Sequence, residues 1–242
     1  MSITPCDYLY QQFNTIKDMY RDTLIMENIQ PIYTKNIFTY QNQVRKGEKR
    51  SPMSAKYFNS CTQYLAMFKS RSYHFLFKDC SIGRFHYEFD ADYKLTSYNL
   101  LWFPCPFSND FLDQVKDSQL HFFEFLDSIE EIDNFKYEDF SFRTPIRIDY
   151  DANYEGSKTD FHPTSHIHFQ HTDTRAKNNG VFCLYKFFNF IIENCYPEFN
   201  YKFHEEENNI TAEMMKNSTY WLRVKKIINP ELGRKIYTSY SF

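Results

Sequence analysis

The chain reads FRTPIRIDYDANYEGSKTDFHPTSHIHFQH from residue 142 to residue 171, and four of its eight histidines lie in this stretch together with three aspartates. Two short runs within it, RIDYD (147–151) and SHIHFQ (165–170), alternate between polar and apolar residues. This two-residue period is typical of β-strands that expose one face and bury the other. The stretch therefore predicts two neighbouring strands.

If the two strands pair in one sheet and rest on the same core, their polar side chains lie on one common surface. That surface would carry Arg147, Asp149, Asp151, His166, His168 and Gln170. Two imidazoles at positions i and i+2 of a strand are within reach of one metal ion, and a carboxylate from the neighbouring strand supplies an oxygen ligand. A mixed histidine and carboxylate set suits zinc, manganese or iron.

Length and composition limit the class of protein. A chain of 242 residues is long enough for one large domain, and we expect residues 1–242 to form a single one. Its net charge of -3 and isoelectric point of about 6.2 exclude a polycation that binds nucleic acid by bulk charge. No apolar run is long enough to cross a bilayer, and the N-terminus does not resemble a signal peptide. We therefore expect a cytoplasmic protein without a membrane partner.

Helical periodicity dominates the first 70 residues. Thr4 and Pro5 are a suitable cap and first turn for an amphipathic helix that ends before Pro31. A weaker helical segment is expected over residues 33–43, and a third helix over residues 54–68. We expect this N-terminal helical segment to pack on an α+β body formed by residues 71–242.

From residue 73 the period changes to two, and the runs YHFLF, RFHYEFD and LTSYNLLWF predict a three-stranded antiparallel meander. Its middle run places Arg84, His86 and Glu88 opposite a row of aromatic residues. Further helices are expected over residues 109–126, 178–195 and 211–228. The predicted fold class is α+β, with a mainly antiparallel sheet of about five strands covered by helices mainly on one face.

Five landmarks follow one another in the chain: DCSIGRFHYEFD (79–90), YNLLWFPCP (98–106), RIDYD (147–151), HPTSHIHF (162–169) and IIENCYP (191–197). In this order they resemble the bacterial family known as domain of unknown function 2290, and the HP-x-SH-x-H element is the most specific part. The resemblance implies that one functional unit contains Arg147, Asp149, His162, His166 and His168. It implies no reaction, although it suggests membership of a toxin or phage-defence system.

The first functional hypothesis is a metal-dependent hydrolase that cleaves a phosphodiester. Its divalent ion, zinc or manganese, would be held by Asp149, His166 and His168, with Glu88 as a further ligand, and would activate water. Either Arg147 or Arg84 would stabilise the phosphate charge. His162, in a turn before a proline, would be a third histidine ligand or a general acid and base. The catalytic candidates are thus Arg147, Asp149, His162 and His168.

Three alternatives use the same residues. In a purely structural role, His166 and His168 only form hydrogen bonds with Asp149 and Arg147 in a polar sheet. In a metal-free hydrolase, one histidine oriented by Asp149 is the base and another protonates the leaving group. In a binding module without turnover, the same polar surface recognises a nucleotide, an RNA end or a protein partner, which includes a second copy of the chain. The chain contains no GxxxxGK[ST], GxGxxG, HExxH or GxSxG motif, so nucleotide-triphosphatase, dinucleotide-binding, zincin and serine-hydrolase classes lack their residues.

Overall fold

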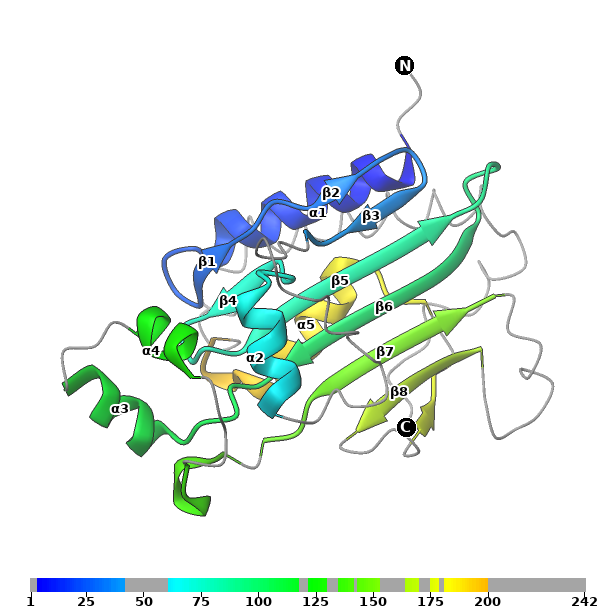
Figure 1. Ribbon diagram of the computed structural model, residues 1–242. Coiled ribbons are helices and arrows are strands. Elements are labelled where there is room, and N and C mark those ends of the chain that lie inside the picture. Colours follow the sequence, from blue (N-terminus) through cyan, green and yellow to red (C-terminus); the bar gives the residue numbers. More distant parts are fainter. Residues whose placement is uncertain are drawn as a thin grey trace, which may run out of the picture.

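The computed structural model describes residues 4–41, 61–117, 122–129, 135–141, 143–152, 164–169, 175–178 and 181–199 (Figure 1). The helix expected over residues 211–228 and the start of the one expected over residues 54–68 lie outside these ranges. The described α-helices are α1 (Pro5–Tyr20), α2 (Cys61–Lys69), α3 (Asn109–Asp117), α4 (Phe122–Ser128) and α5 (Leu184–Cys195), and a short 3-10 helix, η3, spans Tyr137–Asp139. The described strands are β1 (Ile25–Asn28), β2 (Ile32–Tyr33), β3 (Ile37–Thr39), β4 (Phe75–Phe77), β5 (Ile82–Phe89), β6 (Leu95–Phe103), β7 (Ile146–Asp151), β8 (Ser165–Phe169) and β9 (Arg175–Lys177).

The nine strands of the described residues form one antiparallel sheet in the order β1-β4-β5-β6-β7-β8-β9, and the β2–β3 hairpin joins it through β5. The predicted α+β class with a mainly antiparallel sheet is confirmed. The predicted meander is also confirmed, because β4, β5 and β6 are its three strands. The sheet is wider than the expected five strands, since the N-terminal region and β9 contribute strands that the periodicity did not reveal.

The N-terminal helix begins as predicted. The Thr4 hydroxyl accepts a hydrogen bond from the backbone N–H of Asp7, and the Asp7 carboxylate accepts one from the backbone N–H of Thr4. This reciprocal capping box satisfies donors that the first helical turn would otherwise leave without partners. Pro5 occupies the first helical turn, where a missing N–H costs nothing.

In the N-terminal region the first helix is shorter than its apolar spacing indicated, and the second predicted helix was wrong. Helix α1 ends at Tyr20, and the chain then forms β1, in which Ile25 pairs with Phe77 of β4. The helix expected over residues 33–43 is instead the β2–β3 hairpin. Phe38 is fully buried opposite Tyr87 of β5, so pairing with the sheet outweighs a weak local helical preference.

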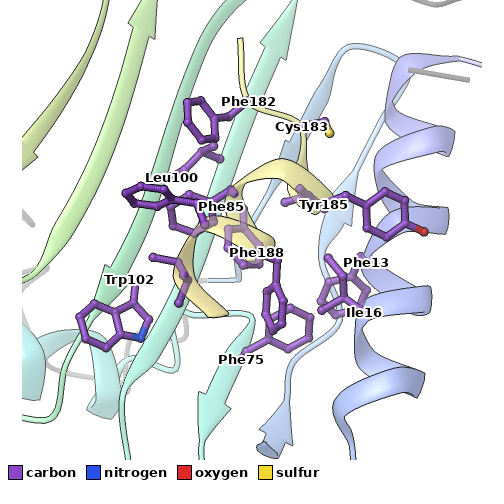
Figure 2. Close-up of a cluster of buried hydrophobic side chains, with 14 of the residues drawn as sticks. Phe13, Ile16, Phe75, Phe85, Leu100, Trp102, Phe182, Cys183, Tyr185 and Phe188 are labelled. Atoms are coloured by element: carbon purple, nitrogen blue, oxygen red, sulfur yellow. The ribbon is translucent and has the colours of Figure 1, made fainter. Parts of the chain in front are cut away.

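Helices cover both faces of the sheet, whereas the sequence predicted that they cover mainly one. Helices α1 and α5 pack on one face, where Figure 2 shows Phe13, Phe75 and Phe188 converging. Helices α2, α3 and α4 pack against the other face in a second apolar cluster that includes Leu101 and Phe103.

No helix in the described part of the chain is long and apolar enough to span a membrane.

Two further helices differ from their expected bounds. The helix expected over residues 178–195 begins only at Leu184, because the Tyr87 hydroxyl donates to the carbonyl oxygen of Phe182 and the Tyr98 hydroxyl accepts from its N–H. These two contacts hold the preceding residues extended. The helix expected over residues 109–126 is described as two helices, α3 and α4.

One histidine lies inside the aromatic core. His74 is fully buried among aromatic rings that include Phe13, Phe38 and Phe85, and its Nδ1 accepts a hydrogen bond from the backbone N–H of Phe85. Burial lowers the pKa of His74 to about 3, and the nearby Arg84 contributes to the decrease. The His74 side chain is therefore neutral in the folded protein at pH values above about 3.

This burial predicts a pH dependence of stability. The unfolded chain protonates His74 below about pH 6.5, whereas the folded chain does not do so until about pH 3. Between these values the unfolded state binds more protons, so the free energy of unfolding falls as the pH decreases. We expect the contribution of His74 to fall by about 2–3 kcal/mol between pH 7 and pH 4.5.

Urea unfolding at both pH values tests this expectation with the variant His74→Phe. Between pH 7 and pH 4.5 the free energy of unfolding of His74→Phe should fall by about 2–3 kcal/mol less than that of the parent. This difference does not depend on the stability of the variant at pH 7. The variant His86→Asn is the control, because His86 is only half-buried. If the parent and His74→Phe lose the same stability on acidification, the lowered pKa of His74 in the folded protein is contradicted.

Candidate functional site

The polar surface predicted from the two alternating runs forms where β7 pairs with β8. In this antiparallel pair Arg147 lies opposite His168 and Asp149 lies opposite His166. Because side chains alternate between the two faces of a strand, all four point to the same face of the sheet. The pairing and the common surface are both confirmed.

Two more strands extend this surface. Asn99 of β6 lies opposite Asp149 on one side and opposite His86 of β5 on the other. Arg84 and Arg147 likewise flank Leu101 of β6. The resulting rows run across four strands, so residues that are far apart in the chain become neighbours on one face. We call this set the polar face, and it comprises Arg84, His86, Glu88, Ser97, Asn99, Arg147, Asp149, His166 and His168.

The Asp149 carboxylate is the centre of the contacts on the polar face. Its Oδ1 accepts a hydrogen bond from Asn99 Nδ2 at 2.5 Å. Its Oδ2 accepts one from Arg147 Nε at 2.8 Å and lies 3.2 Å from His168 Nε2. The Nε2 atom of His166 is 3.9 Å from the same oxygen. Both histidines therefore present a ring nitrogen to one carboxylate oxygen.

Three of the four central side chains are buried although they are polar, while the Asp149 side chain is 23 % exposed. His166 is 5 % exposed, Arg147 is 6 % exposed and His168 is 1 % exposed. Burial by itself would raise the pKa of the Asp149 carboxyl, but the hydrogen bond from His168, the charge of Arg147 and the hydrogen bond from Asn99 outweigh it and hold that pKa below its usual value. Asp149 is therefore an anion at neutral pH.

Three of these side chains could hold a metal ion. One donor atom each from Asp149, His166 and His168 can be chosen so that all three lie within 4.8 Å of one another, and in the described part of the chain this is the one such group. Ligands of one zinc ion are bonded to it at about 2.0–2.2 Å, so a small adjustment of the side chains would close the cluster around an ion. Two histidines and one carboxylate also leave coordination positions for water.

The structure does not bring Glu88 into this cluster. Glu88 lies on β5, two strands from β7, and its carboxylate contacts His86 Nε2 at 3.1 Å and accepts a hydrogen bond from the Ser97 hydroxyl at 3.0 Å. The ligand set found among the described residues therefore lacks Glu88, although the sequence favoured it. His162, the remaining candidate, lies outside the described residues, as does Gln170.

Arg84 lies at the edge of the same surface. Its guanidinium carbon is 4.7 Å from the centre of the Tyr40 ring, a cation–π contact, and its Nε atom is shielded from solvent. Burial lowers the pKa of Arg84; Tyr40 and Asp149 act against this decrease, while Arg147 adds to it. The two arginines are thus close enough for their charges to act on each other.

Asn99 was missed by sequence reasoning. The run LTSYNLLWF predicts a strand, but its pattern alone assigns no role to its polar residues. The available signal was the alternation itself, because Ser97 and Asn99 face the side opposite to Tyr98 and Leu100. Its partner Asp149 could not have been identified, since the register between β6 and β7 is a tertiary property.

Comparison with known proteins gives a match to a family. The family described as uncharacterized conserved protein (DUF2290) matches residues 24–229, a span that includes every strand of the polar face. No curated protein and no solved structure matches the chain. The match covers most of the chain and agrees with the resemblance found in the five sequence landmarks. The chain therefore belongs to the DUF2290 family of uncharacterized conserved proteins.

Proposed function

We propose that this protein is a metal-dependent hydrolase whose substrate is a phosphodiester, with a nucleic acid or a nucleotide as its partner. The observation that carries the proposal is the convergence of the partly buried Asp149 and the buried His166 and His168 on one face of the sheet, with their donor atoms within 4.8 Å. Zinc and manganese both accept this mixture of imidazole and carboxylate ligands.

The residues around the cluster support such chemistry. An ion bound there would lower the pKa of a water molecule so that it becomes a nucleophile near neutral pH. Asp149 is already deprotonated, which is the state a metal ligand requires. Arg147 holds the Asp149 carboxylate through its Nε atom and places a positive charge beside the site. A guanidinium group in this place would stabilise the negative charge that a phosphodiester gains as it is attacked.

A second candidate is a metal-free hydrolase. The Asp149 oxygen that faces the histidines also accepts a hydrogen bond from Arg147 and lies 3.2 Å from His168 Nε2. This geometry is that of a histidine oriented by a carboxylate for proton transfer, with His166 as the second imidazole. A binding module that uses the same polar face without turnover is the third alternative.

The first test is the metal content and metal affinity of the purified protein. We expect about one zinc or manganese ion per chain, and a loss of affinity of at least 100-fold in the double variant His166→Ala/His168→Ala, because two of three ligands are removed. His86→Ala is the matched control, since His86 lies on the same face but outside the ligand group. The control should retain the affinity of the parent.

Activity separates the three candidates. Hydrolysis of oligonucleotides and of a chromogenic phosphodiester, with manganese or with a chelator, should require metal and should fall by at least 100-fold in Asp149→Asn. Hydrolysis that survives the chelator would favour the metal-free mechanism. If the protein takes up no metal and hydrolyses no substrate, both hydrolase mechanisms are overturned and the binding module remains.

A further prediction concerns Asn99, which fixes the carboxylate of Asp149 from β6. The nearly isosteric variant Asn99→Leu removes the donor, so we expect a loss of metal affinity of about 10–100-fold, the usual effect of removing a group that orients a ligand. The control is Ser97→Ala on the same strand and face, because Ser97 bonds Glu88 instead of Asp149. Unchanged affinity in Asn99→Leu, or equal losses in both variants, would contradict this role.

A further inference from the structure

Two cysteines of the second apolar cluster lie side by side. Strands β5 and β6 pair until Ile82 lies opposite Phe103, and Cys80 and Cys105 each lie two residues beyond this pair, at the same end of the two strands. The Cys105 thiol is hydrogen-bonded with the Cys80 thiol. Both residues belong to the cluster that packs against α2, and neither is in a disulfide. Their sulfur atoms are therefore neighbours, although the residues are far apart in the chain.

Tyr64 of α2 contacts both cysteines. Its hydroxyl donates a hydrogen bond to the carbonyl oxygen of Cys80 at 2.6 Å, and the same hydroxyl is hydrogen-bonded with the Cys105 thiol. Tyr64 is fully buried, so water does not compete for these contacts. The tyrosine thus holds the turn before β5 against the end of β6, and with it the two thiols.

The backbone of Cys80 has an unusual conformation. Its φ angle is 64°, in the left-handed region that residues with a side chain rarely adopt. The Cys80 N–H donates to the carbonyl oxygen of Phe77, so the residue closes a tight turn between β4 and β5. Conformations of this kind persist only where surrounding contacts enforce them, and they cluster at functional sites. The enforced backbone at Cys80 points to a role for this thiol beyond packing.

The surroundings of Cys105 favour its thiolate. Burial by itself would raise the pKa of the Cys105 thiol, but the hydrogen bonds from the Cys80 thiol and from the backbone N–H of Phe107 outweigh it and lower that pKa. The charge of Arg143 acts in the same direction. The thiolate is the form of cysteine that reacts with oxidants. Cys105 is 1 % exposed and Cys80 is 7 % exposed, so an oxidant that reaches them has to be small.

We propose that Cys80 and Cys105 are a peroxide-sensitive thiol pair that forms a reversible disulfide. The Cys105 thiolate attacks hydrogen peroxide, which gives a sulfenic acid on Cys105 and a hydroxide ion that takes up the proton lost by Cys105. The Cys80 thiol then attacks the sulfenic sulfur, which forms the disulfide and releases water. Two thiols are oxidised and one peroxide is reduced to two water molecules. The pair is independent of the proposed hydrolase, because neither cysteine belongs to the group that could hold a metal ion.

The test is oxidation of the full chain with hydrogen peroxide, followed by alkylation of the remaining thiols, digestion with trypsin and mass spectrometry. Trypsin releases Cys80 in the peptide 79–84 and Cys105 in the peptide 95–116, and each peptide contains one cysteine. We expect a disulfide between these two peptides that dithiothreitol breaks. It should form at least 10-fold faster in the folded chain than in urea, because the fold holds the two thiols together.

Two variants separate this pair from the other cysteines. In Cys80→Ser the second step lacks its thiol, so the sulfenic acid on Cys105 should persist and be trapped by dimedone. Cys61→Ser is the control, because the Cys61 thiol is close enough to Cys105 for their charges to interact, and it should form the disulfide like the parent.

The peptide map of the parent does not depend on whether either variant folds. Oxidised parent chains in which peptides 79–84 and 95–116 stay unlinked would overturn the proposal. So would a disulfide that joins Cys61 to Cys105 in place of Cys80. Absence of trapped sulfenic acid on Cys105 in Cys80→Ser would overturn the assignment of Cys105 as the residue that attacks the peroxide.

Discussion

The register between β7 and β8 is the constraint on which the polar face depends. Arg147 lies opposite His168 and Asp149 opposite His166, so each strand contributes its polar residues to the same side. A slip of one residue would turn the histidines of β8 toward the core and Ile167 toward the polar face. Burial of Ile148 on the opposite side opposes such a slip. The slip would remove apolar contacts and would leave buried polar groups without partners.

The strand register also explains how a largely buried surface can be so polar. Asp149 receives contacts from three strands: Asn99 from β6, Arg147 from its own strand and His168 from β8. These contacts keep the carboxylate charged inside the protein and lower its pKa. A charged group maintained in a partly buried position, as Asp149 is with its side chain 23 % exposed, is typical of sites that bind ions or perform proton transfer. The arrangement that stabilises the sheet here is therefore also the one that prepares a site.

The opposite face of the sheet shows why the site lies where it does. Helices α1 and α5 bury an aromatic layer against that face, and α2, α3 and α4 cover an apolar part of the polar side, around Leu101 and Phe103. The sheet is thus rigidly supported from behind, and its polar residues are arranged on a fixed scaffold. Rigid scaffolds of this kind can hold catalytic or binding groups in place.

Local periodicity was enough to predict the α+β class and the β4–β6 meander, and the alternation of side chains along a strand placed the polar residues of each of β7 and β8 on one face. Which strands are neighbours followed only from the fold. It assigned Asn99 to Asp149, placed Arg84 in the row of Arg147 and left Glu88 with His86, and it converted the expected helix at residues 33–43 into a hairpin. Strand order and register depend on contacts between distant segments, and the local pattern of a single segment does not contain these contacts.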